Sequence, residues 1–98
     1  MRRVVYYRGP TAEVTNERFV RYSANGQTVF AIAEITDVTT EVIDGPRWRV
    51  WRRARGLRLR AWHRGVLVVL YEHPDPRVFN MVCRALQRSL ENRPESHF

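Results

Sequence analysis

The chain has 98 residues and a formal net charge of +7, with 44% hydrophobic and 28% charged residues. This length and composition suit one globular domain with a single core, which we place at residues 1–94 with a loose tail at 95–98, and they argue against a disordered chain. No apolar run approaches the ~20 residues of a membrane-spanning helix, and the start of the chain has no apolar region of signal-peptide length, so we expect a cytoplasmic protein.

The first half of the chain predicts short strands separated by turn signals. Asn25-Gly26 is the strongest hairpin signal, because both residues tolerate the positive φ of a type I′ turn. Asp44-Gly45-Pro46 is a clear break. Runs of β-branched, aromatic or alternating residues predict strands at Val4 to Arg8, Thr11 to Thr15, Arg18 to Ser23, Thr28 to Ala33 and Ile35 to Ile43.

The second half predicts one more hairpin after an ambiguous segment. Residues 47 to 55 fit a helical and a strand period equally, so their conformation stays open. Beyond Gly56, apolar residues alternate strictly with polar or large ones up to Trp62, which predicts a half-buried strand. His63-Arg64-Gly65 is a hairpin turn, and Val66 to Glu72 is apolar on both faces, which predicts a central strand or one covered by a helix.

A C-terminal amphipathic helix follows. Asp75 is a good N-cap, Pro76 suits the first helical position, and the helix is expected to reach Arg93 before Pro94 ends it. Its apolar stripe at i, i+3, i+4 spacing comprises Val78, Met81, Val82, Ala85, Leu86 and Leu90. About seven strands followed by one helix predict a mainly β (α+β) fold, an antiparallel barrel or sandwich capped by the helix.

Several segments stand in a recognisable order: Tyr6-Tyr7-Arg8-Gly9-Pro10, Val14-Thr15-Asn16-Glu17-Arg18-Phe19, Phe30 with Ile32, Glu34-Ile35-Thr36-Asp37-Val38, Leu59 with Ala61, Arg64-Gly65, Arg77-Val78-Phe79-Asn80 and Arg84-Ala85-Leu86-Gln87. Together they resemble a family of small actinobacterial proteins of unknown function, related to bacterial PH-like (pleckstrin-homology-like) domains. Many members carry a hydrophobic insert where this chain has residues 45–53, so the resemblance implies a soluble variant with a PH-like barrel. It implies no activity.

Catalytic and metal-binding patterns are missing from the sequence. His63, His73 and His97 lie far apart in turns or the tail, without metal-ligand spacing, and are expected at the surface. The single cysteine, Cys83, borders the apolar stripe as a small boundary residue. Asp37 and Glu41 share a face of the predicted strand, but carboxylates paired with neighbouring arginines explain them better than acid–base catalysis does. We therefore expect no enzyme, no cofactor and no metal.

Charge is the most informative feature of the sequence. All basic residues are arginine, and eight of the 17 lie between residues 47 and 64, a segment without any acid. The rest of the chain holds nine arginines and ten acids, so the whole net charge belongs to this segment. The candidate binding surface taken from it comprises Arg47, Trp48, Arg49, Trp51, Arg52, Arg53, Arg58, Arg60 and Trp62.

Several uses of this surface remain open. Arginine and tryptophan dominate protein interface hot spots, so a non-catalytic module that binds a protein partner, with homodimerisation as one form, is our main hypothesis. The same residues suit single-stranded nucleic acid, by charge and stacking, or an anionic membrane surface. In the plainest alternative, the tryptophans pack in the core and the arginines form a solvated face.

Overall fold

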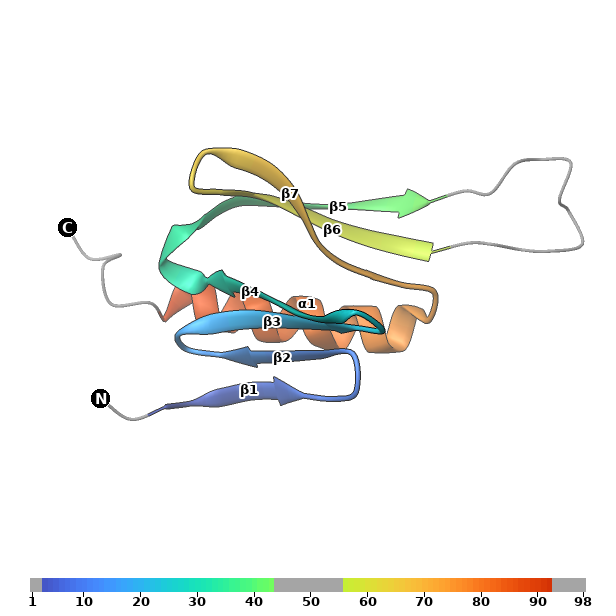
Figure 1. Ribbon diagram of the computed structural model, residues 1–98, viewed down its shortest axis with the longest axis horizontal. Helices are drawn as coiled ribbons and strands as arrows, with labels where there is room; N and C mark the ends of the chain where they lie inside the picture. Colours follow the sequence, from blue (N-terminus) through green and yellow to red (C-terminus); the bar gives the residue numbers. More distant parts are fainter. Residues whose placement is uncertain (1–2, 44–55, 93–98) are drawn as a thin grey trace, which may run out of the picture.

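The computed structural model describes residues 3–43 and 56–92, and its strands form two antiparallel sheets. The first sheet has the order β1-β2-β3-β4, with bounds β1 Val5–Arg8, β2 Ala12–Thr15, β3 Arg18–Ser23 and β4 Gly26–Ala31. A 3-10 helix, η1 (Ile32–Glu34), leads into the second sheet, β5-β6-β7. Its bounds are β5 Ile35–Ile43, β6 Gly56–His63 and β7 Val66–His73, and the helix α1 (Pro76–Glu91) follows (Figure 1).

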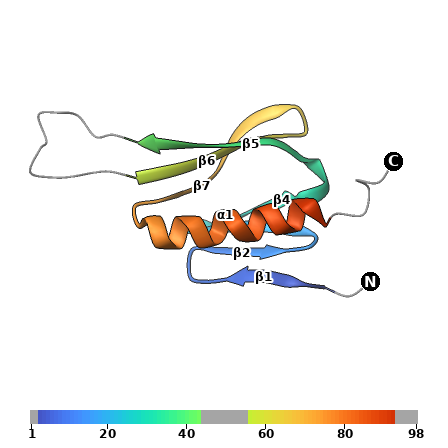
Figure 2. The same cartoon turned by 180° about the vertical axis from the view of Figure 1, so that it is seen from behind.

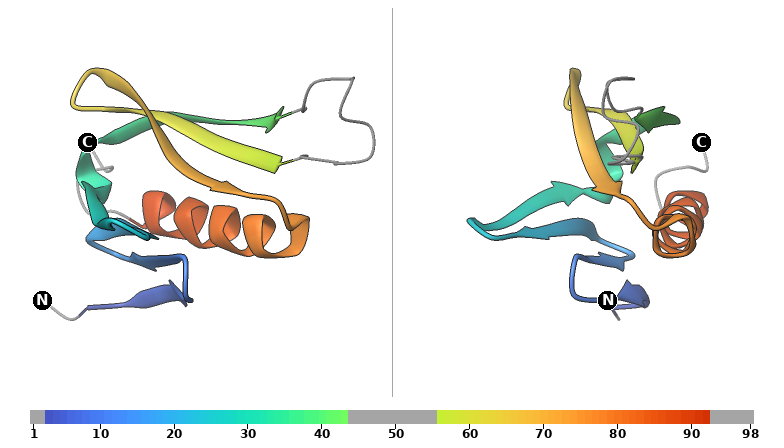
Figure 3. Two further views of the ribbon diagram at one scale, coloured as in Figure 1. Left: turned by 45° about the vertical axis from the view of Figure 1, so that its right-hand side comes forward. Right: turned by 90° about the vertical axis from the view of Figure 1, so that its right-hand side faces the viewer.

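The predicted fold class is confirmed at the level of a mainly β fold with one C-terminal helix. Seven antiparallel strands and α1 appear in the expected order. The sheets do not close into a barrel, because no strand of one sheet pairs with a strand of the other in the described part of the chain. Figure 2 shows α1 running alongside the first sheet. Figure 3 shows the second sheet apart from the first, with the end of β7 leading to the start of α1. The predicted break at 44–46 and the tail at 95–98 lie outside the described residues.

Helix α1 begins where the sequence predicts and ends earlier. The Asp75 side chain accepts a hydrogen bond of 2.9 Å from the Arg77 backbone N–H, and Pro76 occupies the first turn. These contacts satisfy or remove backbone donors that a helix start leaves free. The helix ends at Glu91 with Asn92 as its C-cap, so the expected extension to Arg93 is wrong.

The buried stripe of α1 is rotated from the predicted one. Met81 is 50% exposed, whereas Phe79 and Ser89, which the prediction omitted, are buried. Phe79 and Ser89 are the first and last buried residues of α1, and both side chains contact the sheets. The Ser89 hydroxyl donates a 2.7 Å hydrogen bond to the Thr15 carbonyl, so a polar residue can be buried there without loss. The core that the helix covers comprises Ala12, Val14, Phe19, Phe30, Ile32, Ile35, Leu59, Ala61, Leu70, Tyr71, Phe79, Val82, Ala85 and Leu86.

The predicted hairpin turn at Arg64-Gly65 is confirmed, and this turn, rather than Asn25-Gly26, has the two positive φ values of type I′. Arg64 and Gly65 have φ of 56° and 78°, and they join His63 to Val66 as a two-residue hairpin loop. In the β3–β4 hairpin only Gly26 has positive φ, because Ser23 pairs with Gly26 and the loop therefore starts one residue earlier than predicted. That register places Phe19 opposite Phe30 in the core, and burial fixes strand register more strongly than turn preference does.

Strand β7 is an edge strand, so of the two predicted positions, central or covered by a helix, the structure has the second. The sheet order places β6 in the middle, and Val66 at the start of β7 is 60% exposed. A register shift opposite Leu59 inserts one extra residue in β7, and Leu70 and Tyr71 are consequently both buried. The second half of the strand is thus covered, as the continuous apolar run suggested.

Strand β5 also departs from strict alternation. Thr36 pairs with Trp62 and Thr39 with Arg60, so the strand carries an extra residue, and Asp37 has φ of 52° at that point. The bulge reverses which side later residues face. The expectation that Asp37 and Glu41 share a regular strand face is therefore wrong.

Candidate functional site

The structure describes three members of the candidate surface, Arg58, Arg60 and Trp62, and all three belong to β6. They alternate with the buried residues Leu59 and Ala61, so they lie on the face of the β5-β6-β7 sheet that points away from the core. We call this face the outward face. The other six members, Arg47, Trp48, Arg49, Trp51, Arg52 and Arg53, lie outside the described residues.

Arg58 and Arg60 are paired with carboxylates from the two neighbouring strands. Arg58 Nη1 lies 3.0 Å from Glu41 Oε1 on β5, and Arg58 Nε lies 2.9 Å from Glu72 Oε2 on β7. Arg60 Nη1 lies 3.5 Å from the same Glu41 oxygen. The hydrogen bonds that Arg58 donates to Glu72, and then to Glu41, raise the pKa of Arg58 above its ordinary value. The prediction that Glu41 pairs with neighbouring arginines is confirmed.

The outward face is consequently close to neutral around Arg58. Two arginines face two carboxylates, although the sequence from residue 47 to residue 64 contains no acid. The compensating charges come from strands that are distant in sequence and adjacent in the sheet. For these two arginines the interpretation as a salt-bridged, solvated face holds, and a strong basic patch does not form.

Trp62 has different surroundings from the two arginines. It is 42% exposed and lies directly opposite Leu67, which is 44% exposed, in the β6–β7 ladder. Trp62 is therefore not a core residue, and with Leu67 it forms an apolar pair that water contacts.

The histidines differ from the prediction. His63 is the last residue of β6 rather than part of a turn, and its side chain is only 16% exposed. Its ring packs edge-on against Phe30 at 5.3 Å, and its buried Nε2 lies 3.8 Å from Glu34 without a hydrogen bond. His73 stacks on Tyr71, and its Nδ1 accepts a hydrogen bond from the Asp75 N–H. His97 lies outside the described residues. Over 3–43 and 56–92, no three His, Cys, Asp or Glu side chains gather as a metal-ligand cluster.

Cys83 occupies the boundary position that the sequence predicts. It is half-buried on α1, and burial raises the pKa of its thiol to about 11. The thiol is therefore protonated at neutral pH, and only the thiolate is a strong nucleophile.

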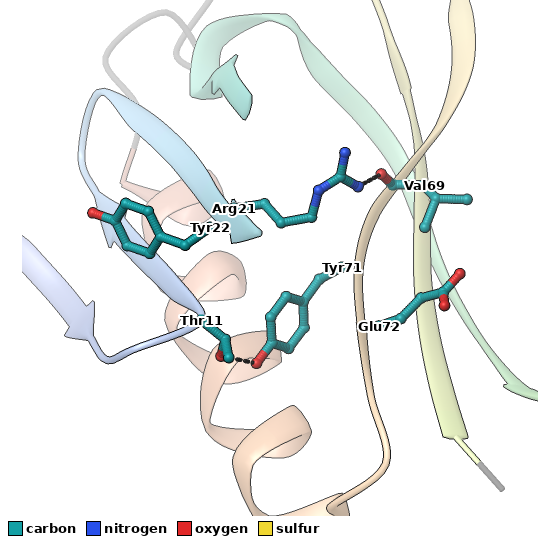
Figure 4. Close-up of a pocket in the computed structure, with 6 residues that line it drawn as sticks. All are labelled: Thr11, Arg21, Tyr22, Val69, Tyr71 and Glu72. Carbon is teal, nitrogen blue, oxygen red and sulfur yellow. Dashed lines mark hydrogen bonds between the residues drawn. The ribbon is translucent and has the colours of Figure 1, made fainter. Parts of the chain in front are cut away.

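A cleft between the two sheets was not predicted. It has a volume of about 380 Å³ and is lined by Thr11, Arg21, Tyr22, Val69, Tyr71 and Glu72 (Figure 4). Arg21 reaches across from β3, and its Nη1 donates a 2.6 Å hydrogen bond to the Val69 carbonyl of β7. Below it, the hydroxyl groups of Thr11 and Tyr71 share a 2.6 Å hydrogen bond. The one sequence signal for this cleft was the placement of Arg21 on the same strand face as apolar Phe19.

No helix in the described residues is long and apolar enough to cross a membrane. No protein-family model, no curated protein and no solved structure matches this chain. The resemblance to the small actinobacterial family therefore stays a prediction.

Proposed function

We propose that this protein is a non-catalytic binding module that docks a protein partner on the outward face, at Trp62 and Leu67. The observation that carries the proposal is the exposure of a tryptophan directly opposite an exposed leucine on the outward face. We also propose a PH-like architecture. Its support is the order of four antiparallel strands, three antiparallel strands and one C-terminal helix.

An exposed aromatic–aliphatic pair is a sound basis for protein docking. Tryptophan offers a large apolar area and loses little conformational freedom when a partner covers it. Arg60, paired with Glu41, is the neighbour of Trp62 on this face of β6, and the ion pairs of Arg60 and Arg58 would form a polar rim beside the anchor. Because opposite charges already pair within the chain, this rim does not require a strongly acidic partner.

The second candidate is binding of nucleic acid or an anionic membrane surface by the segment 47–64. The pairing of Arg58 and Arg60 with carboxylates favours the protein-binding hypothesis over this one. The dependence of binding on salt concentration distinguishes the two hypotheses. Phosphate binding by several arginines weakens log-linearly as salt rises, whereas contact through Trp62 and Leu67 does not. A gel shift with single-stranded DNA or RNA at low salt tests the former directly, and sedimentation with anionic liposomes tests the membrane version.

The docking experiment compares immobilised wild type with Trp62→Ala, and with Val42→Ala as a matched control. Val42 is exposed on β5 but belongs to neither the Trp62–Leu67 pair nor the ion pairs. Proteins retained at high salt by the wild type and the control should be lost from Trp62→Ala, with circular dichroism verifying the fold. Equal retention by all three would contradict the proposal.

A second copy of this chain is the first partner to examine. Light scattering of the wild type should then give a mass that rises with concentration above 11.7 kDa. Trp62→Ala should return the mass to that of the monomer. A constant monomer mass for the wild type would exclude homodimerisation and leave other protein partners.

A further inference from the structure

Arg21 is a half-buried cation without an ionised partner in the described part of the chain. Three arginines there are half-buried, and the other two, Arg58 and Arg60, form ion pairs with carboxylates. Arg21 instead uses neutral acceptors, the Val69 carbonyl at 2.6 Å and the Thr28 hydroxyl at 3.5 Å. Neutral acceptors satisfy hydrogen bonds but do not balance a positive charge that is partly removed from water.

The position of the guanidinium is fixed by its surroundings. Its Cζ atom lies 5.8 Å from the centre of the Phe30 ring, in a cation–π contact, while Val69 holds one end. A guanidinium carries five N–H donors, and these contacts use two of them. The remaining donors stand at the cleft between β3 and β7 (Figure 4).

The rest of the cleft leaves room for a small ligand. Its volume of about 380 Å³ lies at the lower end of the range for small-molecule sites. Val69 borders the cleft with its backbone carbonyl, and Thr11 and Tyr71 border it with their paired hydroxyl groups. Glu72 also lines the cleft, but Arg58 holds its carboxylate at 2.9 Å, so Glu72 does not neutralise Arg21.

We propose that this cleft binds a small organic carboxylate, with the carboxylate on the Arg21 guanidinium. One planar guanidinium matches the two oxygens of a carboxylate in a bidentate pair. A phosphate dianion would need a second cation, and Arg58, the nearest candidate across Glu72, already has two carboxylates. The proposed ligand is therefore a monoanion, and this site is separate from the Trp62 docking face.

The test is an NMR titration of the ¹⁵N-labelled full chain with 3-phenylpropionate. Saturable shifts are expected for the Arg21 side-chain Nε–Hε signal and for the amides of Thr11, Val69 and Tyr71. The uncharged analogue 3-phenylpropanol and inorganic phosphate serve as comparison ligands, and both should bind at least about tenfold more weakly, since charge-assisted bidentate pairs are the stronger ones. This comparison needs no variant.

Variants then assign the effect to Arg21. Arg21→Gln should weaken 3-phenylpropionate binding about tenfold or more, and Arg21→Lys, which keeps the charge but loses the planar fork, should fall between Arg21→Gln and the wild type. Arg18→Gln is the matched control, because Arg18 is exposed on the same strand and does not line the cleft. Equal binding of acid and alcohol, equal binding of phosphate, or unchanged binding by a folded Arg21 variant would each overturn the proposal.

Discussion

The two faces of the β5-β6-β7 sheet are built from the same strands and are held by different forces. On the inner face, Leu59 and Ala61 of β6 are buried against the core. On the outward face, Arg58 and Arg60 alternate with them in sequence and form ion pairs with neighbouring strands in contact with water. One strand thus supplies both packing and a polar surface, because its side chains alternate.

The two faces differ in how much they contribute to the stability of the fold and in whether they can bind a partner. Burying a large apolar side chain contributes about 1.5–3 kcal/mol, whereas an exposed ion pair contributes about 0.2–1 kcal/mol. Stability should therefore reside in the inner face, and substitutions on the outward face should change binding before they change folding.

Leu59→Ala should show the largest effect on stability. Leu59 is buried in the core, so the variant loses apolar burial and leaves a cavity, which lowers the free energy of unfolding by about 2–5 kcal/mol. Chemical denaturation measures this loss. Leu67→Ala on the outward face serves as control and should change stability by less than about 1 kcal/mol, because Leu67 is 44% exposed. Similar losses in both variants would contradict the assignment of stability to the inner face.

Tyr71→Phe should show an intermediate effect. The variant keeps the buried ring and removes the 2.6 Å hydrogen bond to Thr11, which links β7 to the start of β2. The expected loss is about 0.5–1.5 kcal/mol, the ordinary net value of such a bond, with the same denaturation assay. Thr11→Val removes the other partner. The double variant should lose less than the sum of the two single losses, and strict additivity would show that the bond does not contribute.

Alkaline pH should lower the free energy of unfolding through two groups that pack in or against the core, Tyr71 and Cys83. Burial raises the pKa of Tyr71 above the ordinary value of 10.0, and it raises the pKa of Cys83 from 9.0 to about 11. In the unfolded chain these groups lose their protons at lower pH, so their stabilising contribution is complete below pH 9 and is lost as the pH rises through the folded-state values. Unfolding measured from pH 8 to 11 should show this decline.

Cys83→Ala should reduce the part of the alkaline decline that begins near pH 9. The ion pairs of Arg58 are not lost over this range, since its pKa is raised further by Glu72 and Glu41. A decline that persists unchanged in Cys83→Ala and Tyr71→Phe would mean that other groups cause it.

Local signals in the sequence predicted the elements that depend on neighbouring residues. The N-cap of α1 at Asp75 and the alternation of Leu59 with Arg58 and Arg60 both appear in the structure. These features follow from backbone geometry within a few residues. The number and order of the strands followed from the same kind of signal.

Features that depend on pairing between strands were not predicted. The bulge at Asp37 and the extra residue at Leu70 result from how the core fills, and each changes which side chains face inward. The same limit affected the site. Arg58 appeared to lie in an acid-free region because Glu41 and Glu72 are adjacent to it only in the folded sheet.

The smallest expected effect on stability belongs to the outward ion pairs. A double-mutant cycle of Arg58→Gln and Glu41→Gln should give a coupling of about 0.2–1 kcal/mol at low salt, which falls further in 1 M NaCl. Both side chains are partly in water, and the 3.0 Å contact between them is screened. A coupling above about 2 kcal/mol would show that this face stabilises the fold as the core does.

Removing the carboxylates should have a larger effect on binding than on stability. Glu41→Gln with Glu72→Gln leaves Arg58 and Arg60 uncompensated, so the outward face becomes basic without changing the packed inner face. Retardation of single-stranded DNA at low salt should increase relative to the wild type, with a steeper dependence on salt. The control is Glu17→Gln with Glu91→Gln, two exposed changes away from the outward face that alter the net charge by the same amount. If the control and the double variant bind DNA equally, the two carboxylates do not hold the outward face neutral, and the contrast between the two faces loses its functional meaning.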